Sequence, residues 1–256
     1  MNKKVAVFVN DDFFSKYAFK KLKKDYQVFP FSLKKIKNFN SFVLKEVNLN
    51  LLFDFLKKNK IEFVFFAGKI NQNIVFDNLH PSVKNFLSEV GDFKPEKILK
   101  KLVNFLEENE IKVLYENQIF KEEIVEEKIF TYPPTEKELE DIKFGFSVLK
   151  DIAKYNIGQS IIVKNGMVLG IEGIEGTDQL IKRVGKYCKD FVFIKGCSEN
   201  KDLRFDMPVI GMRTIKNLIK ESGKVIAVKA YKTIILQKEK VIEECKKNKI
   251  KLVGVK

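Results

Sequence analysis

The sequence predicts an α/β protein of two domains, an N-terminal Rossmann-like parallel sheet and a C-terminal mixed α/β domain. Two observations lead to this prediction. In residues 1–130, short apolar runs alternate with stretches of helical periodicity, the pattern of a parallel α/β sheet. After the double proline Pro133-Pro134, an Asn-Gly hairpin signal follows and glycine becomes frequent.

The N-terminal elements show two signatures. Residues 5–9 are all apolar and acidic residues follow almost at once, as in a buried parallel strand that ends in a loop. Residues 49–59 place Leu52 and Leu56 on one face of a helix. By the same signatures we expect helices at 15–24 and 94–109 and strands at 27–31, 62–68 and 112–115.

The two prolines mark the domain boundary, because proline continues neither a helix interior nor a paired strand. Thr135 and Glu138 then form a capping box at the start of a helix at 136–155. We therefore expect an N-terminal domain at 1–130, a linker at 131–135 and a catalytic domain at 136–256.

The C-terminal elements begin with a hairpin. Two β-like runs, 160–163 and 167–172, flank Asn165-Gly166, a pair of residues suited to a two-residue turn. Apolar runs and helical spacing then predict helices at 177–187, 214–222 and 238–247, and strands at 191–195, 225–230, 233–236 and 251–255.

Composition and charge argue against some classes of function. The net charge is +14, but the lysines fall mostly in pairs on helical faces, and no RNA-binding aromatic motif, zinc-finger spacing or helix-turn-helix accompanies them. We expect a solvated basic surface and no nucleic-acid partner. The apolar runs are too short to cross a membrane, so cytoplasmic residence is expected. The three cysteines form no CxxC pair, which favours reduced thiols over a zinc site.

One candidate site lies at the expected strand-to-helix junction 172–178. Three carboxylates, Glu172, Glu175 and Asp178, stand there among glycines. A hard cation such as Mg²⁺ would offset their mutual repulsion. Alternatively, Thr177 or Asp178 caps the following helix, and a helix N-terminus with nearby glycine N–H groups also binds phosphate.

A second candidate site follows the strand at 191–195. Asp202, Arg204 and Asp206 alternate with apolar residues, so an extended segment would point all three to one side. Two carboxylates beside a guanidinium suit a metal ion and a phosphate together, although a salt-bridged surface edge has the same pattern. Lys195, at the end of the strand, adds a possible phosphate contact.

Several other chemistries are excluded or disfavoured. His80, the one histidine, stands before Pro81 in a polar loop, so histidine-based triads and histidine-rich metal sites are excluded or disfavoured. Neither a GxxxxGK[ST] loop nor a GxGxxG turn after the first strand is present. Metal-assisted attack of water on phosphorus needs only carboxylates, a metal ion and cationic side chains, all of which the sequence can supply.

The two candidate sites resemble motifs of one family. Residues 172–178 and Leu180 are similar to the "EAIEGTDAML" stretch, and residues 202–211 to the "QDLRVDLPTIG" stretch, of the UDP-2,3-diacylglucosamine pyrophosphatases of lipid A biosynthesis, the LpxI family. Weaker matches run along the chain in order, at Ala67-Gly68, Gly91-Asp92, Ile157-Gly158-Gln159 and 252–255. The sequence departs from the family at 9–13, where the family has a glycine-rich loop.

The resemblance implies a reaction and its setting. The enzymes of this family hydrolyse UDP-2,3-diacylglucosamine to 2,3-diacylglucosamine 1-phosphate (lipid X) and UMP, depend on Mg²⁺, and hold the lipid product between two domains. It also implies a homodimer, located in the cytoplasm and peripheral to the inner membrane. Mn²⁺ could replace Mg²⁺.

Motifs and resemblance together predict the site residues. Asp206 is expected as the essential carboxylate, with Asp202 and Arg204 beside it. Substrate contacts are expected from Lys195, Thr177, Thr214 and Gly68, and metal ligation from Asp206, Asp202, Asp178 and Glu175. The altered loop at 9–13 leaves one alternative open, a non-catalytic regulator of the same fold that binds nucleotide sugar or lipid.

Overall fold

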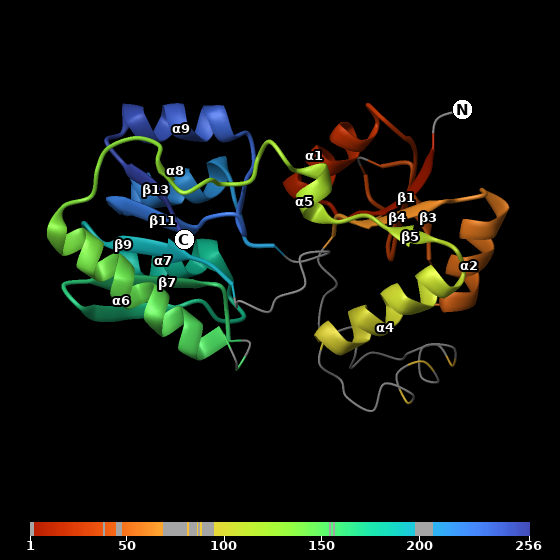
Figure 1. The fold of residues 1–256 in the computed structure, drawn as a ribbon, viewed down its shortest axis with the longest axis horizontal. Coiled ribbons are helices and arrows are strands. Elements are labelled where there is room, and N and C mark those ends of the chain that lie inside the picture. The colour runs from red at the N-terminus through yellow and green to blue at the C-terminus, as the bar shows by residue number, and fades with distance from the viewer. Residues whose placement is uncertain are drawn as a thin grey trace. The chain divides into compact units, whose positions relative to one another are not determined.

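The computed structural model describes residues 3–37, 39–44, 48–68, 81, 86, 88, 95–153, 155, 157–197 and 207–256. The chain forms two compact units, an N-terminal one that ends at Ile119 and a C-terminal one that begins at Phe120 (Figure 1). Each unit consists of helices packed on a β-sheet, which confirms the α/β class.

The N-terminal sheet is parallel in every strand pair described. Its order is β3-β2-β1-β4-β5, an order found in Rossmann-like folds, and confirms the predicted parallel sheet. The five strands are β1 (Lys4–Phe8), β2 (Gln27–Ser32), β3 (Phe42–Val43), β4 (Phe63–Phe66) and β5 (Lys112–Val113).

Both faces of this sheet are buried. Ala6 and Phe8 of β1 pack in one cluster with Leu52 and Val103, which lie on two of the helices. Val5 and Val7 point to the opposite face because side chains alternate along a strand, and they are buried too. This explains the all-apolar run. The described helices are α1 (Phe13–Leu22), α2 (Leu49–Lys58), α4 (Pro95–Glu108) and α5 (Glu116–Ile119).

The C-terminal sheet is mixed, as predicted. Three strands are parallel, while β6 and β7 run antiparallel to their neighbours. In the order β6-β13-β11-β9-β7-β8, the strands are β6 (Lys128–Ile129), β13 (Lys251–Val255), β11 (Val225–Lys229), β9 (Val192–Lys195), β7 (Ser160–Lys164) and β8 (Met167–Ile171). A separate pair joins β10 (Val209–Ile210) and β12 (Ile234–Ile235).

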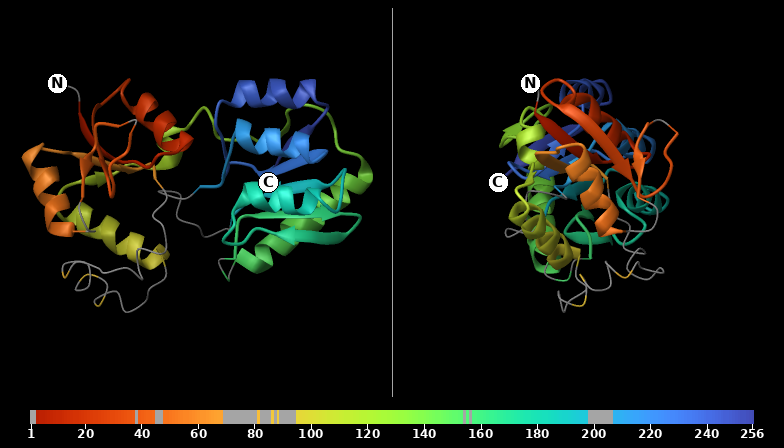
Figure 2. Two further views of the ribbon diagram at one scale, coloured as in Figure 1. Left: turned by 180° about the vertical axis from the view of Figure 1, so that it is seen from behind. Right: turned by 90° about the vertical axis from the view of Figure 1, so that its right-hand side faces the viewer.

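Helices cover both faces of the C-terminal sheet. Helix α6 (Glu136–Ala153) packs on one face, where Gly145 lies so close to Ile194 that a Cβ atom would be 2.0 Å from Cδ1. Figure 1 shows α6 in front of the sheet, and the view from behind in Figure 2 shows the other helices on the opposite face. These are α7 (Thr177–Gly185), α8 (Met212–Lys220) and α9 (Lys238–Lys247).

Two local sequence signals are confirmed by geometry. Asn165 and Gly166 both have positive φ, 50° and 71°, as a type I′ hairpin turn requires. The buried carboxylate of Asp141 accepts hydrogen bonds from both of their N–H groups and ties the turn to α6. At the start of α6, the N–H of Thr135 donates to Glu138 Oε2, and the N–H of Glu138 donates to Thr135 Oγ1.

The segment before α6 lies along the C-terminal sheet. Gly254 and Lys128 are partners in the pairing of β13 with β6. Thr131 Oγ1 donates to the carbonyl of Ile250 and accepts from the N–H of Leu252, both at 2.8 Å. Thr131, the first residue of the expected linker 131–135, is therefore itself anchored to the start of β13. Within the described ranges, no helix is long and apolar enough to cross a membrane.

Candidate functional site

Three strands of the C-terminal sheet bring polar residues to one edge. Lys195 is the last residue of β9, and Ser160, the first of β7, lies opposite it in the antiparallel register. Glu172 directly follows β8, and its N–H donates to the Ser160 carbonyl at 2.9 Å. In open α/β sheets, ligands bind outside the carboxyl ends of the parallel strands, which is where these residues lie.

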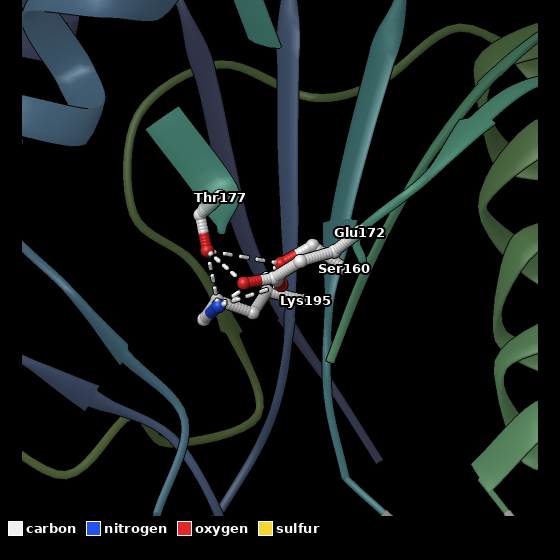
Figure 3. A network of polar contacts seen from close by, with 4 residues as sticks. All are labelled: Ser160, Glu172, Thr177 and Lys195. Carbon is white, nitrogen blue, oxygen red and sulfur yellow. Dashed lines mark hydrogen bonds and ion pairs between the residues drawn. The ribbon is translucent and has the colours of Figure 1, made fainter. Parts of the chain in front are cut away.

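The side chains at this edge form one hydrogen-bonded network (Figure 3). Lys195 Nζ lies 2.8 Å from Thr177 Oγ1, 2.9 Å from Ser160 Oγ and 3.4 Å from Glu172 Oε2. Thr177 in turn donates its hydroxyl proton to Glu172 Oε1 at 2.9 Å. These three oxygens match the three protons of the ammonium group.

The side chains of this network are buried, so their interactions affect the stability of the fold. Lys195 is 4% exposed and Glu172 8%, while Ser160 is fully buried. A charge at such a position is tolerated only with a partner of opposite charge and further hydrogen bonds, and here both are present. The network therefore fixes the ammonium of Lys195 in place and couples the end of β9 to the start of α7.

Gly158 shapes the same edge from the backbone. A Cβ atom on Gly158 would lie 2.1 Å from the carbonyl oxygen of Glu172, so only glycine lets the two chain segments approach this closely. The resemblance to the family at Ile157-Gly158-Gln159 falls on this contact. The contact holds the backbone of Glu172 in the position from which its side chain reaches Thr177.

Two helices begin beside this network. Gly176 precedes α7 and Gly211 precedes α8, and neither helix has a side-chain hydrogen bond at its N-cap within the described part of the chain. Arg213 Nε lies 2.6 Å from Asp178 Oδ2, which joins the first turns of the two helices. Helix N-termini carry partial positive charge and N–H groups without helical partners, so this edge is suited to an anion such as phosphate.

The expected metal ligands are only partly described. Glu175 pairs with Arg183 at 2.9 Å, and its own backbone N–H and Arg183 hold the pKa of its carboxyl below the ordinary value. Asp178 pairs with Arg213. Among the described residues no three His, Cys, Asp or Glu side chains gather into a possible metal site. Asp202 and Asp206, like Arg204, lie outside the described residues, so the predicted Mg²⁺ site stays a prediction.

The remaining predicted substrate contacts lie on both units. Thr214 is in the first turn of α8, next to Arg213, and is 8% exposed. Gly68 lies two residues beyond β4 in the N-terminal unit, where a Cβ atom would lie 2.9 Å from Asn10 Nδ2. The strands β1 and β4 are adjacent at the point where the strand order reverses, a position at which open α/β sheets bind ligands.

The altered loop at 9–13 has a definite structure. Asp12 accepts a hydrogen bond from the N–H of Ser15 at 2.7 Å and so caps α1. Ser15 Oγ donates to the carbonyl of Ala67 and accepts from the N–H of Asn10, which ties the loop after β1 to the loop after β4. A carboxylate therefore occupies a helix N-terminus that is otherwise suited to an anion.

Comparison with known proteins identifies the family. A model of the LpxI N-terminal domain matches residues 15–123, and a model of the LpxI C-terminal domain matches residues 126–253. The chain belongs to the LpxI family. The resemblance inferred from the motifs is thereby confirmed.

One member of the LpxI family matches part of this chain. Over 118 residues the chain is 28% identical to the UDP-2,3-diacylglucosamine pyrophosphatase LpxI of Caulobacter vibrioides. This match covers 43% of the chain and 42% of that protein, so it spans less than half of either.

The sequence pattern predicted some residues of this candidate site and missed others. It named Lys195 and Thr177, which the structure brings into direct contact. It gave no role to Ser160 or Arg213. The one sign of Ser160 in the sequence was its position, as a polar residue at the start of an apolar strand. Nothing in the sequence pattern pointed to the pairing of Arg213 with Asp178.

Proposed function

We propose that this chain hydrolyses the pyrophosphate bond of UDP-2,3-diacylglucosamine, releasing 2,3-diacylglucosamine 1-phosphate (lipid X) and UMP in lipid A biosynthesis. Family membership over both domains supports this proposal, and so does the name of the Caulobacter vibrioides relative. Both findings also support the broader statement that the chain is a hydrolase acting on a lipid A precursor.

The observation that carries the proposal is the contact between Lys195 and Thr177. It anchors the N-terminus of α7 at the carboxyl end of β9, and the pair Asp178–Arg213 brings the N-terminus of α8 beside it. A pyrophosphate placed there would meet N–H groups of both helices. Their fixed orientation is what stabilises charge that develops on phosphate oxygens in the transition state.

The network suggests how Lys195 acts. With three acceptors around its ammonium, Lys195 is held in the wall of the site. We expect its charge to favour the anionic substrate at short range, while Thr177 and Thr214 in the first turns of α7 and α8 contact the phosphates. Gly68 is proposed as a further substrate contact.

Catalysis is assigned to the residues that follow β9. Asp206 is the essential carboxylate, as a metal ligand or as the base that orients water, and Asp202 and Arg204 act with it. Asp206 and Asp202, with Asp178 and Glu175, would hold Mg²⁺ or Mn²⁺, and the bound ion would supply charge compensation and an activated water. Binding a cation at Asp178 and Glu175 would compete with their arginine partners.

The two acyl chains of the substrate determine where the protein is expected to work in the cell. These chains keep the substrate in a bilayer, so the protein is proposed to work in the cytoplasm at the inner membrane surface. A homodimer is proposed as well. Light scattering over a range of concentrations tests it, and a constant mass of 29.8 kDa would contradict it.

The reaction is tested with UDP-2,3-diacylglucosamine in detergent, with Mg²⁺ or with EDTA. Wild type should release UMP only with the metal. Asp206→Asn should lose at least about 100-fold in rate while its melting temperature stays unchanged. Asp190→Asn, a change of an exposed carboxylate outside the site, is the matched control. An Asp206→Asn variant with wild-type turnover would overturn the assignment.

One observation favours a second candidate. Asp12 places a carboxylate at the N-terminus of α1, where the family has a glycine-rich loop, and this lowers the affinity expected there for an anion. The second candidate is a non-catalytic regulator that binds nucleotide sugar or lipid. Substrate binding in calorimetry, with no UMP released under any divalent metal, would favour the regulator.

A further inference from the structure

The outward side of α7 is a basic stripe beside the candidate site. Four polar residues recur there at intervals of three and four, so they share one side of the helix. With Ile171, Glu175 and Tyr187 they line a shallow hollow of about 840 Å³. The four are Gln179, Lys182, Arg183 and Lys186. Arg183 also donates to the carbonyl of Ile171 at the end of the edge strand β8.

Helix α8 extends this basic surface. It packs beside α7 on the same face of the sheet, and the residues 174–190 and 211–224 around the two helices contain eight basic and four acidic side chains. Each acidic side chain pairs with one of the basic ones: Glu175 with Arg183, Asp178 with Arg213, Asp190 with Lys224 and Glu221 with Lys189.

Four lysines remain in excess. No described carboxylate lies within ion-pair distance of Lys182, Lys186, Lys216 or Lys220, which are all at least partly exposed. A surface in which every acid is neutralised and four ammonium groups are left over is complementary to an anionic partner. We call the surface of α7 and α8 the α7–α8 face.

Apolar side chains distinguish the kind of partner. Ile174, just before α7, is 100% exposed, and Tyr187, just after it, is 87% exposed. Met167 on the edge strand β8 is 61% exposed. Lysines on a helix with exposed apolar residues at both of its ends match a membrane interface, where ammonium groups meet lipid phosphates and apolar side chains enter the acyl boundary. A nucleic acid would neutralise the lysines but leave Ile174 in water.

We propose that the α7–α8 face binds a membrane surface that contains anionic phospholipids. Lys182, Lys186, Lys216 and Lys220 contact the headgroups, and Ile174 and Tyr187 insert beside them. This inference rests on the proposed function, because a substrate with two acyl chains is the reason to expect a bilayer as the partner. The N-termini of α7 and α8 lie at one end of this face, so a substrate drawn from the bilayer reaches the phosphate-binding edge over a short path.

The test is flotation of the chain of residues 1–256 with vesicles of phosphatidylcholine, with and without one quarter phosphatidylglycerol. Wild type should float only with the anionic vesicles, and less as salt is raised. Lys182→Glu with Lys186→Glu should weaken binding about tenfold or more. Ile174→Ser with Tyr187→Ser should weaken it without changing its salt dependence.

The matched control carries the same charge change on the opposite face of the sheet. Lys143→Glu with Lys150→Glu alters two exposed lysines of α6 and should change vesicle binding less than about threefold. Equal loss in both charge-reversed variants would overturn the proposal, because net charge alone would then explain the binding. Equal binding to both kinds of vesicle, no binding at all, or displacement from vesicles by DNA or RNA would overturn it too.

Measurements of turnover distinguish a failure of this proposal from a failure of the proposed function. Lys182→Glu with Lys186→Glu should keep wild-type turnover on substrate in detergent and lose about tenfold on substrate in anionic vesicles. If no variant hydrolyses the substrate, the proposed function fails, while flotation still decides whether the α7–α8 face binds membranes.

Discussion

Lys195 Nζ lies 2.8 Å from Thr177 Oγ1, so the last residue of β9 is hydrogen-bonded to the first residue of α7. Ser160 and Glu172 are further acceptors beside the same ammonium group. Four segments that are separate in the sequence therefore meet at one buried cation.

Removing the cation should be costly. Lys195→Met removes the ammonium group that is paired with the buried carboxylate of Glu172, and we expect the free energy of unfolding to fall by about 3 to 5 kcal/mol. Lys195→Met combined with Glu172→Gln should recover part of this loss, because no uncompensated charge then remains. Urea unfolding of the single and double variants measures both. Lys189→Met, on an exposed lysine, is the control. Additive losses in the double variant would contradict a direct coupling.

Gly158 should tolerate no side chain. Gly158→Ala would force apart the backbones of residues 158 and 172, which lie too close for a Cβ atom. We expect a loss of about 1 to 3 kcal/mol in the free energy of unfolding, and weaker substrate binding because Glu172 shifts. Gly211→Ala is the control, since its nearest neighbour, Leu236 Cβ, would be at an ordinary 3.6 Å. Equal stability of the two variants would show that the approach at Gly158 is not tight.

Glu138 makes stability depend on pH. Burial raises the pKa of its carboxyl, but hydrogen bonds from Lys251 and from the N–H and hydroxyl of Thr135 outweigh burial, so the pKa lies below its ordinary value. A carboxyl with a lower pKa in the folded state stabilises the fold above its unfolded pKa. That stabilisation is lost as the pH falls through the folded pKa.

Glu138→Gln should therefore lower the free energy of unfolding by about 1 kcal/mol at neutral pH. The difference from wild type should shrink as the pH falls below about 4.3, the ordinary pKa of a glutamate, because the unfolded chain takes up the proton first. Thermal melts at a series of pH values measure this difference, with Glu140→Gln on the exposed side of α6 as the control. A difference that stays constant down to about pH 3 would contradict a role for the carboxylate charge.

Helix packing at Gly145 gives a prediction for the fold. A Cβ atom at this position would lie 2.0 Å from Ile194 Cδ1, so Gly145→Ala should push α6 away from β9. We expect a loss of about 1 to 3 kcal/mol in the free energy of unfolding. Ser147→Ala, on the exposed side of the same helix, should change stability by less than about 0.5 kcal/mol. Calorimetric melting of both variants measures the two changes in stability.

The sequence predicted long, periodic elements better than short ones. The apolar run at the start of the chain and the capping box at Thr135 correctly predicted β1 and the beginning of α6. The strands β3 and β6 have two residues each, and α5 has four. Such short segments carry no hydrophobic period, because tertiary pairing alone makes them regular.

The same limit applied to the site. Lys195 and Thr177 could be named because each stands at the end of a predicted element. Their contact with Ser160 depends on the antiparallel register of β7 with β9, which no local pattern encodes. Likewise, Asp178 meets Arg213 only because α7 and α8 pack side by side. Sequence could propose the residue types, and packing selected the partners.

The most direct test of the central claim is the identity of the products. UDP-2,3-diacylglucosamine is incubated with the chain and Mg²⁺, and the products are followed by phosphorus NMR and mass spectrometry. Cleavage of the pyrophosphate bond predicts UMP and 2,3-diacylglucosamine 1-phosphate in equal amounts. UDP with the free sugar would mean cleavage of the glycosidic bond instead, and unchanged substrate that still binds would mean no hydrolysis. Either result would contradict the account.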